Sequence, residues 1–143
     1  MKMRLLLGDQ LNIEHSWFKK TEDDVCYVQM EMRQETDYAP HHIQKVVAFF
    51  GAMRNFEKEI KQKGHHTQYL TLDDPENKQH LTENLNHLIQ KHKITSFEYQ
   101  EPDEYRLDKQ IADFCQSLSI PFQMVSSEHF MTSRKALSTF FEG

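Results

Sequence analysis

Three polar segments in this sequence each follow an apolar run typical of a buried strand. The segment "GDQ", residues 8–10, comes directly after Leu5–Leu7. The segment "EMRQE", residues 31–35, and Glu101 each follow another such run. Glycine lets a ligand approach the backbone closely, and carboxylates and amides exchange hydrogen bonds with polar ligands. Because the carboxyl ends of parallel strands share one edge of a sheet, we expect these segments to meet around one binding pocket.

Each polar segment also has a purely structural interpretation. Asp9 and Gln10 could cap a turn or the next helix, as Asp and Gln after a strand often do. Glu31 and Glu35 could be solvated surface charges, and Glu101 could simply precede the next helix. The expected convergence of all three loops at one edge favours the pocket.

Five short runs with strand character alternate with helical patterns along the chain. The predicted strands are Met3–Leu7, Val25–Met30, Thr67–Leu72, Ser96–Gln100 and Pro121–Val125. The first is apolar on both faces, as in parallel sheets covered by helices, whereas the third alternates and is predicted near an edge. Helical spacing of apolar residues predicts helices over 41–64, from Pro75 after the cap Asp74, from Pro102, and in part over 133–141.

This alternation predicts an α/β fold, a Rossmann-like three-layer sandwich. We expect a five-stranded parallel sheet in the order 3-2-1-4-5 with helices on both faces. The strand order then reverses between the first and fourth strands, where such sheets bind their ligands. The length of 143 residues predicts one domain over 1–143.

Composition excludes several function classes. The formal net charge is −5, and no clustered basic face predicts binding to nucleic acid phosphates. No apolar run is long enough to span a membrane. Cys26 and Cys115 are too few for a thiolate cage and are interpreted as buried free thiols of a reducing compartment, which predicts the cytoplasm. Adjacent histidines at 41–42 and 65–66 do not share a helix face, so we expect surface histidines and no metal site.

Two acidic residues suggest another class, a receiver-like signalling domain. Asp73 and Asp74 follow the third predicted strand, where receiver domains carry their phosphoacceptor. The lysine that such domains carry after the fifth strand is absent from "MVSSEHF". The receiver-like domain therefore remains an alternative that lacks the expected lysine.

Four segments together resemble one known family. "LLLGDQLN…HSWF", "YVQMEMRQETDYAPHHIQKVVAFFGAMRNF", "YLTLDD" and "YQEPDEYRLD" are similar to the N-terminal domain of the deoxyribodipyrimidine photolyase-related proteins. These form the bacterial iron–sulfur branch of the photolyase/cryptochrome superfamily, which includes prokaryotic (6-4) photolyases. The similarity covers essentially all 143 residues in order.

The resemblance implies an antenna domain that is one part of a larger flavoprotein. In full-length members a helical domain follows, which holds FAD, a [4Fe–4S] cluster and the site for a flipped-out DNA lesion. That helical domain is absent from this chain and is its expected partner in the parent protein. The resemblance implies that the α/β domain alone is not catalytic, does not contact DNA directly and has no membrane partner. The parent would perform light-driven DNA repair, as a lyase, or blue-light sensing.

The resemblance also implies a chromophore and the residues that hold it. In similar proteins the α/β domain binds 6,7-dimethyl-8-ribityllumazine, which absorbs near-ultraviolet or blue light and passes the excitation to reduced FAD. Glu35 matches a family position that contacts the chromophore, and Phe49 matches an apolar position in the same pocket. Gly8, Gln10 and Glu101 would enclose the ring. The further candidate residues are Asp9, Leu11, Met32 and Lys45.

A structural docking module is the remaining alternative. Such a domain would keep its pocket empty and only support the helical domain, with Phe140 and Phe141 as candidate contacts.

Overall fold

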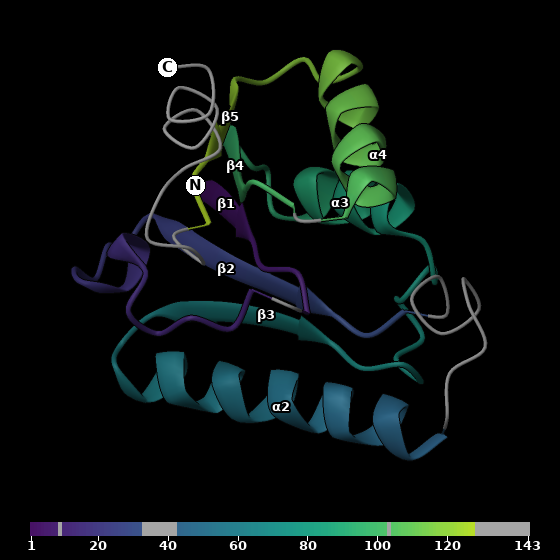
Figure 1. The fold of residues 1–143 in the computed structure, drawn as a ribbon. Helices are drawn as coiled ribbons and strands as arrows, with labels where there is room; N and C mark the ends of the chain where they lie inside the picture. Colours follow the sequence, from purple (N-terminus) through teal and green to yellow (C-terminus); the bar gives the residue numbers. More distant parts are fainter. Residues whose placement is uncertain (9, 33–42, 103, 128–143) are drawn as a thin grey trace, which may run out of the picture.

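A parallel sheet forms the centre of the computed structural model, which describes residues 1–8, 10–32, 43–102 and 104–127 (Figure 1). Its strands are β1 (Lys2–Leu5), β2 (Val25–Met30), β3 (His66–Leu70), β4 (Ser96–Gln100) and β5 (Phe122–Val125). All neighbours pair in parallel, in the order β3-β2-β1-β4-β5. The predicted fold class and strand order are confirmed, and β3 lies at an edge as its alternating pattern predicts.

Helices cover both faces of this sheet. Helix α2 (Ile43–Gln62) packs on one face, and α3 (Leu81–Lys91) and α4 (Tyr105–Gln116) pack on the other (Figure 1). A short 3-10 helix, η1 (Ser16–Phe18), lies on the α2 side. Gly64, with φ of +97°, follows the end of α2, a backbone conformation that favours glycine. The partial helix predicted over 133–141 lies outside the described residues.

Two helices begin later than their prolines predict. Helix α3 starts at Leu81 rather than after Asp74, because side chains in the intervening segment bond the backbone as turns. Asp74 Oδ1 accepts from the Glu76 N–H at 2.9 Å, and Asn84 Oδ1 accepts from the Lys78 N–H at 2.7 Å. Helix α4 starts at Tyr105, three residues after Pro102. Asp74 is thus a turn residue and not a helix cap.

The larger core cluster lies between the sheet and helices α3 and α4. The apolar stripes predicted for these helices are buried there, with Leu85 and Ile111 both at 0% exposure. Cys115 belongs to this cluster, and burial raises the pKa of its thiol to about 11, so it stays protonated. Both cysteines are free, although Cys26 is only half-buried.

An aromatic cluster on the α2 side surrounds a buried arginine. Arg4 Nη1 donates to the Tyr27 hydroxyl at 2.9 Å, and its Nε donates to Glu98 Oε2 at 3.2 Å. The guanidinium also lies 5.0 Å from the Trp17 ring centroid. His65 packs edge-on against Tyr27 and is 4% exposed, so predicting it as a surface histidine was wrong. Burial lowers the pKa of His65 and keeps its ring neutral among these aromatic groups.

We expect Arg4→Ala to lower the free energy of unfolding by about 3 kcal/mol, because it leaves Glu98 buried with one fewer partner. Lys2 is the matched control, since its ammonium also bonds Glu98, at 2.7 Å, but its side chain is 33% exposed. Lys2→Ala should cost about 1 kcal/mol or less. Urea denaturation at pH 7 measures the free energy of unfolding of both variants. Equal losses would contradict the claim that the buried ion pair stabilises the fold more than the exposed one.

Candidate functional site

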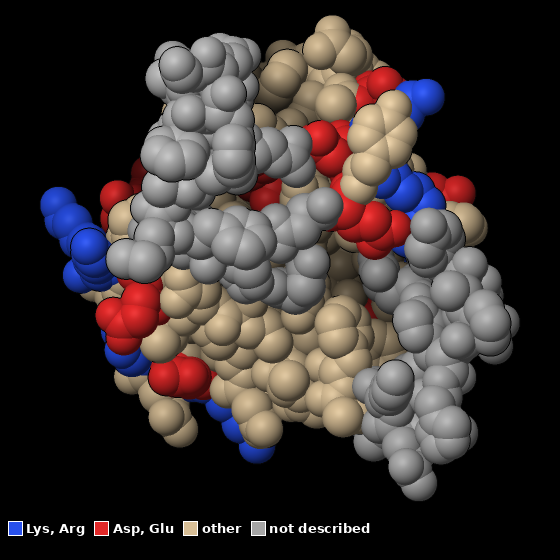
Figure 2. Space-filling model, in the orientation of Figure 1, with Lys and Arg blue, Asp and Glu red and all other residues tan. Residues whose placement is uncertain are grey.

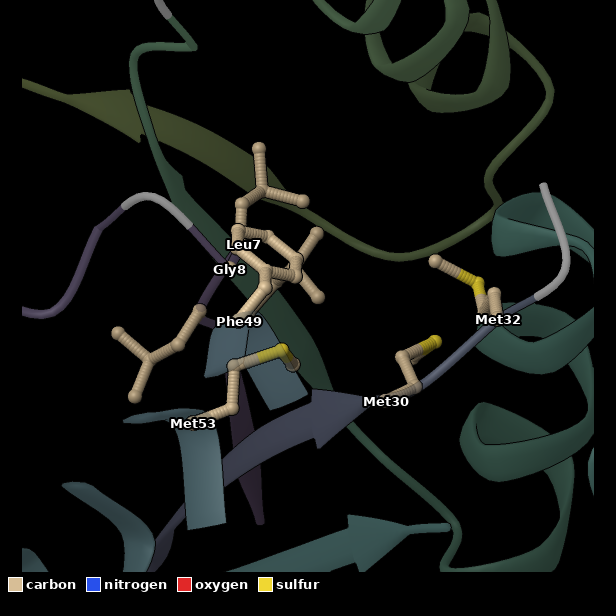
Figure 3. A pocket seen from close by; sticks show the side chains of 8 residues that line it. Leu7, Gly8, Met30, Met32, Phe49 and Met53 are labelled. Atoms are coloured by element: carbon tan, nitrogen blue, oxygen red, sulfur yellow. The ribbon is translucent and has the colours of Figure 1, made fainter. Parts of the chain in front are cut away.

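A small apolar pocket lies at the carboxyl edge of the sheet, on the β2 side of β1 and not between β1 and β4, where the strand order reverses (Figure 3). The end of β1, the end of β2 and one face of α2 form its walls. The lining residues are Leu5, Leu6, Leu7, Gly8, Met30, Met32, Phe49 and Met53. Its cavity volume is about 10 Å³, close to what a single water molecule needs.

The Phe49 ring closes this pocket over Gly8 (Figure 3). A Cβ atom on Gly8 would lie 2.1 Å from Phe49 Cζ and 2.6 Å from Cε1, so the contact requires glycine. Phe49 is 36% exposed, whereas the adjacent Phe50 is buried. The two rings therefore divide the roles, with Phe50 in the interior and Phe49 at the mouth of the pocket.

Gln10 ties the loop after β1 to the end of β4. Its Oε1 accepts from the Leu7 N–H at 3.1 Å, and its Nε2 donates to the carbonyl oxygens of Gln100 and Glu101, both at 3.3 Å. The side chain is 2% exposed. Both amide hydrogens of Gln10 are used within the chain, so in this arrangement it positions the loop.

The other predicted site residues fall into three groups. Met32 lines the pocket with Gly8 and Phe49, and Glu101 reaches the same edge, where its N–H donates to the Val125 carbonyl at 2.7 Å. Leu11 instead packs against the aromatic cluster. The last group comprises Asp9, Glu35 and Lys45. Asp9 and Glu35 lie outside the described residues, and of Lys45, which lies within α2, the side chain is not described.

Glu31 is a buried structural carboxylate, which corrects its interpretation as a solvated surface charge. It is 0% exposed and accepts from Arg54 Nε at 2.6 Å and Nη2 at 2.8 Å. The Tyr69 hydroxyl donates to it at 2.6 Å and the Leu72 N–H at 3.0 Å. Burial opposes ionisation, but the hydrogen bonds from Arg54 and Tyr69 outweigh it and lower the pKa of Glu31. The carboxylate therefore joins the ends of β2 and β3 to α2.

Two buried glutamines near this edge lack full hydrogen bonding, and the sequence analysis missed both. Gln100 is 1% exposed, and neither Nε2 nor Oε1 of its side chain has a hydrogen-bond partner among the residues that the structure describes. Gln29 donates through Nε2 to the Met53 carbonyl at 3.4 Å, but its Oε1 has no partner. In the sequence, both residues could have been noticed as polar amides within runs that are otherwise typical of buried strands.

Neither a metal site nor a phosphoacceptor site emerges from the described part of the chain. There, no group of three or more His, Cys, Asp and Glu side chains could hold a metal ion. Asp73 accepts from the Thr71 hydroxyl at 2.9 Å, and Asp74 caps the turn before α3. Within the same residues, no helix has the length and apolar character that crossing a membrane requires.

We expect Gly8→Ala to lower the free energy of unfolding by about 1–2 kcal/mol, because the added methyl group forces the Phe49 ring aside. In the Phe49→Ala background the same change should cost at least about 1 kcal/mol less. Chemical denaturation of the four proteins of this double-mutant cycle measures the coupling. Additive effects would show that Gly8 is not required by the ring.

The lowered pKa of Glu31 predicts acid-dependent stability. Its contribution is fully present above the unfolded-state pKa of about 4.3 and is lost as the pH falls through the lower folded-state pKa. Glu31→Gln should therefore lower the free energy of unfolding at pH 7 by about 2 kcal/mol and flatten its pH dependence between pH 5 and 3. Glu59→Gln, on the exposed face of α2, is the control and should leave the profile unchanged. Identical acid profiles for the two variants would contradict this role.

Comparison with known proteins now adds to this geometry. A (6-4) photolyase from Agrobacterium fabrum (strain C58 / ATCC 33970) is 28% identical over 132 residues. That match covers 90% of this chain but only 26% of the relative, so the chain spans about a quarter of the length of the curated protein it matches. The family model described as "Deoxyribodipyrimidine photo-lyase-related protein" matches residues 4–143. Because that match includes the whole sheet except its first residues, and the pocket, this chain belongs to the deoxyribodipyrimidine photo-lyase-related protein family.

Proposed function

We propose that this chain is the antenna-chromophore-binding domain of a longer photolyase-related flavoprotein. Its ligand is 6,7-dimethyl-8-ribityllumazine or a similar flat heterocycle, bound at the pocket beside Gly8. The observation that carries the proposal is an apolar pocket at the carboxyl edge of the sheet, beside the end of β1, in a domain of this family. When bound, the heterocycle supplies absorption of near-ultraviolet or blue light, and the protein supplies orientation and exclusion of water.

The side chains around the pocket suit a flat ring. Leu7, Met30 and Met32 offer apolar and polarisable surface for its faces. Unpartnered amide groups of Gln29 and Gln100 stand near the same edge and could bond its polar rim. Buried polar atoms without partners are rare in folded proteins, and a polar ligand is one explanation for them.

The volume of the pocket requires a movement of Phe49. Ligand sites usually enclose a few hundred Å³, far more than the cavity of about 10 Å³ found here. The ring of Phe49 is 36% exposed, so it is not held by packing on all sides. If it rotates outward, the space above Gly8 that it now occupies joins the pocket.

Three further residues are proposed as ligand contacts on the family resemblance. The carboxylate of Glu35 would accept from a ring N–H or a ribityl hydroxyl. Asp9 follows Gly8 directly in the sequence, and Lys45 precedes Phe49 by one helical turn.

The parent protein is proposed to carry FAD and a [4Fe–4S] cluster in a helical domain, which is the partner of this one. The relative named as a (6-4) photolyase is about four times as long as the matched segment, which supports a larger parent acting in light-driven DNA repair. Blue-light sensing is the alternative role for the parent. Two free cysteines agree with a cytoplasmic protein.

Electrostatics support a role without direct DNA contact for this domain. The formal net charge is −5. On the face shown in Figure 2, the Lys and Arg side chains of the described residues are scattered and interspersed with Asp and Glu. Phosphate binding needs basic side chains gathered into one patch.

A docking module without a ligand is the second candidate. The edge strand β5 exposes Phe122 at 44% and Met124 at 46%. Apolar side chains on an edge strand favour contact with another domain.

We expect the purified chain to bind 6,7-dimethyl-8-ribityllumazine, measured as a change in lumazine fluorescence on titration. Met32→Phe adds bulk at a side chain that lines the pocket and is 2% exposed, so it should weaken binding at least about tenfold. Met124→Phe, on the exposed side of β5, is the matched control and should bind as the wild type does.

Absence of binding by the wild-type chain would overturn the antenna proposal and favour the docking module. Binding that Met32→Phe leaves unchanged would place the ligand elsewhere. Circular dichroism of each variant confirms that the fold is kept.

A further inference from the structure

The side chain of Gln100 is a buried amide that bonds no group within the described residues. Only 1% of the residue is exposed, and both Nε2 and Oε1 lack a partner. Such groups are rare because burial removes their hydrogen bonds to water without replacing them. The backbone carbonyl of Gln100 does have a partner, since it accepts from Gln10 Nε2 at 3.3 Å. The orphaned side chain therefore needs a separate explanation.

Strand register places this amide at the reversal of the strand order. Gln100 ends β4, and its neighbour Tyr99 pairs with Leu5 of β1. Because side chains alternate along strands, Gln100 stands on the same face of the sheet as Leu6, which follows Leu5 and lines the pocket. That face is the one covered by α2.

A second incomplete amide lies on the other side of Leu6 on the same face. Val28 pairs with Leu5, so the next residue, Gln29, follows the same alternation as Leu6. Its Nε2 donates to the carbonyl of Met53, another pocket residue, and its Oε1 has no partner. On this face of the sheet, the apolar side chain of Leu6 thus lies between the amide side chains of Gln29 and Gln100.

We propose that Gln100 reads the lactam edge of the bound heterocycle, the adjacent N–H and C=O of an imide or cyclic amide. A primary carboxamide presents one acceptor and one donor side by side, which matches such an edge with two parallel hydrogen bonds. A carboxylate or phosphate group would instead need a cation, and the two orphaned groups here are neutral. This inference rests on the proposed function and deepens it, because it selects heterocycles that keep an N–H beside a carbonyl.

The test compares two probes that differ only at that edge. They are 6,7-dimethyl-8-ribityllumazine and its N3-methyl derivative, titrated against the full chain by fluorescence. Wild type should prefer the N3–H form at least about tenfold, because a methyl group leaves the buried amide unpaired. Gln100→Met, of similar volume and without hydrogen-bonding groups, should bind both probes with equal affinity. Gln123→Met, exposed on β5, is the matched control and should keep the preference.

A thermal melt without ligand separates recognition from a structural role. Removing an orphaned buried amide should leave the Tm of Gln100→Met equal to that of the wild type or raise it. A Tm that falls by several degrees would assign Gln100 to the fold and overturn the inference. Gln100→Leu, which also removes both hydrogen-bonding groups, should likewise bind both probes with equal affinity, and it replaces the methionine variant if that variant does not fold.

The binding of the two probes distinguishes a failure of the proposed function from a failure of recognition by Gln100. If the wild type binds neither probe, the proposed function fails and the inference falls with it. If the wild type binds both probes equally, or if Gln100→Met keeps the preference, the antenna proposal stands and the reading by Gln100 is overturned.

Discussion

The carboxyl edge of the sheet depends on the buried carboxylate of Glu31. A carboxylate at 0% exposure is tolerated only because Arg54, Tyr69 and the Leu72 N–H all donate to it. These donors come from α2, from β3 and from the segment after β3, so one side chain joins three parts of the fold. Burial and the neighbouring Glu31 charge raise the pKa of Tyr69, which keeps its proton in this bond. Since Met32 follows Glu31 in the chain, the same contacts fix one wall of the pocket.

Polar groups at this edge therefore fall into two kinds that look alike in the sequence. Gln10 and Glu31 have their hydrogen bonds satisfied by the chain itself and act as connectors. The side chain of Gln100 has the same chemistry as that of Gln10, but within the described part of the chain it has no hydrogen-bond partner. The difference is not one of residue type or spacing, because it depends on which groups the fold brings within bonding distance. A ligand can bond groups of the second kind without breaking a hydrogen bond inside the chain.

The strand order and the buried helix stripes were predictable because both follow from local periodicity and from the rules of parallel sheets. The start of α3 was not, since Asp74 and Asn84 bond the backbone of the segment between Pro75 and Leu81 and favour turns there. The place of Phe49 beside Gly8 was expected from the family resemblance, which assigned both residues to one pocket. The burial of Glu31 was not, because its partner Arg54 lies 23 residues away in the sequence.

Under the proposed function, the pocket opens to its ligand when Phe49 rotates away from Gly8. The ring lies against the backbone of Gly8, in space that the Cβ atom of any other residue at position 8 would occupy. Its partial exposure means that rotation outward loses only part of its apolar contact, whereas a wholly buried ring would lose all of it. A flat ligand that enters must displace this ring, so its apparent affinity equals its affinity for the open state reduced by the fraction of open molecules. The contact of Phe49 with Gly8 thus fills this part of the pocket, and under the proposed function a bound heterocycle takes its place after one side-chain rotation.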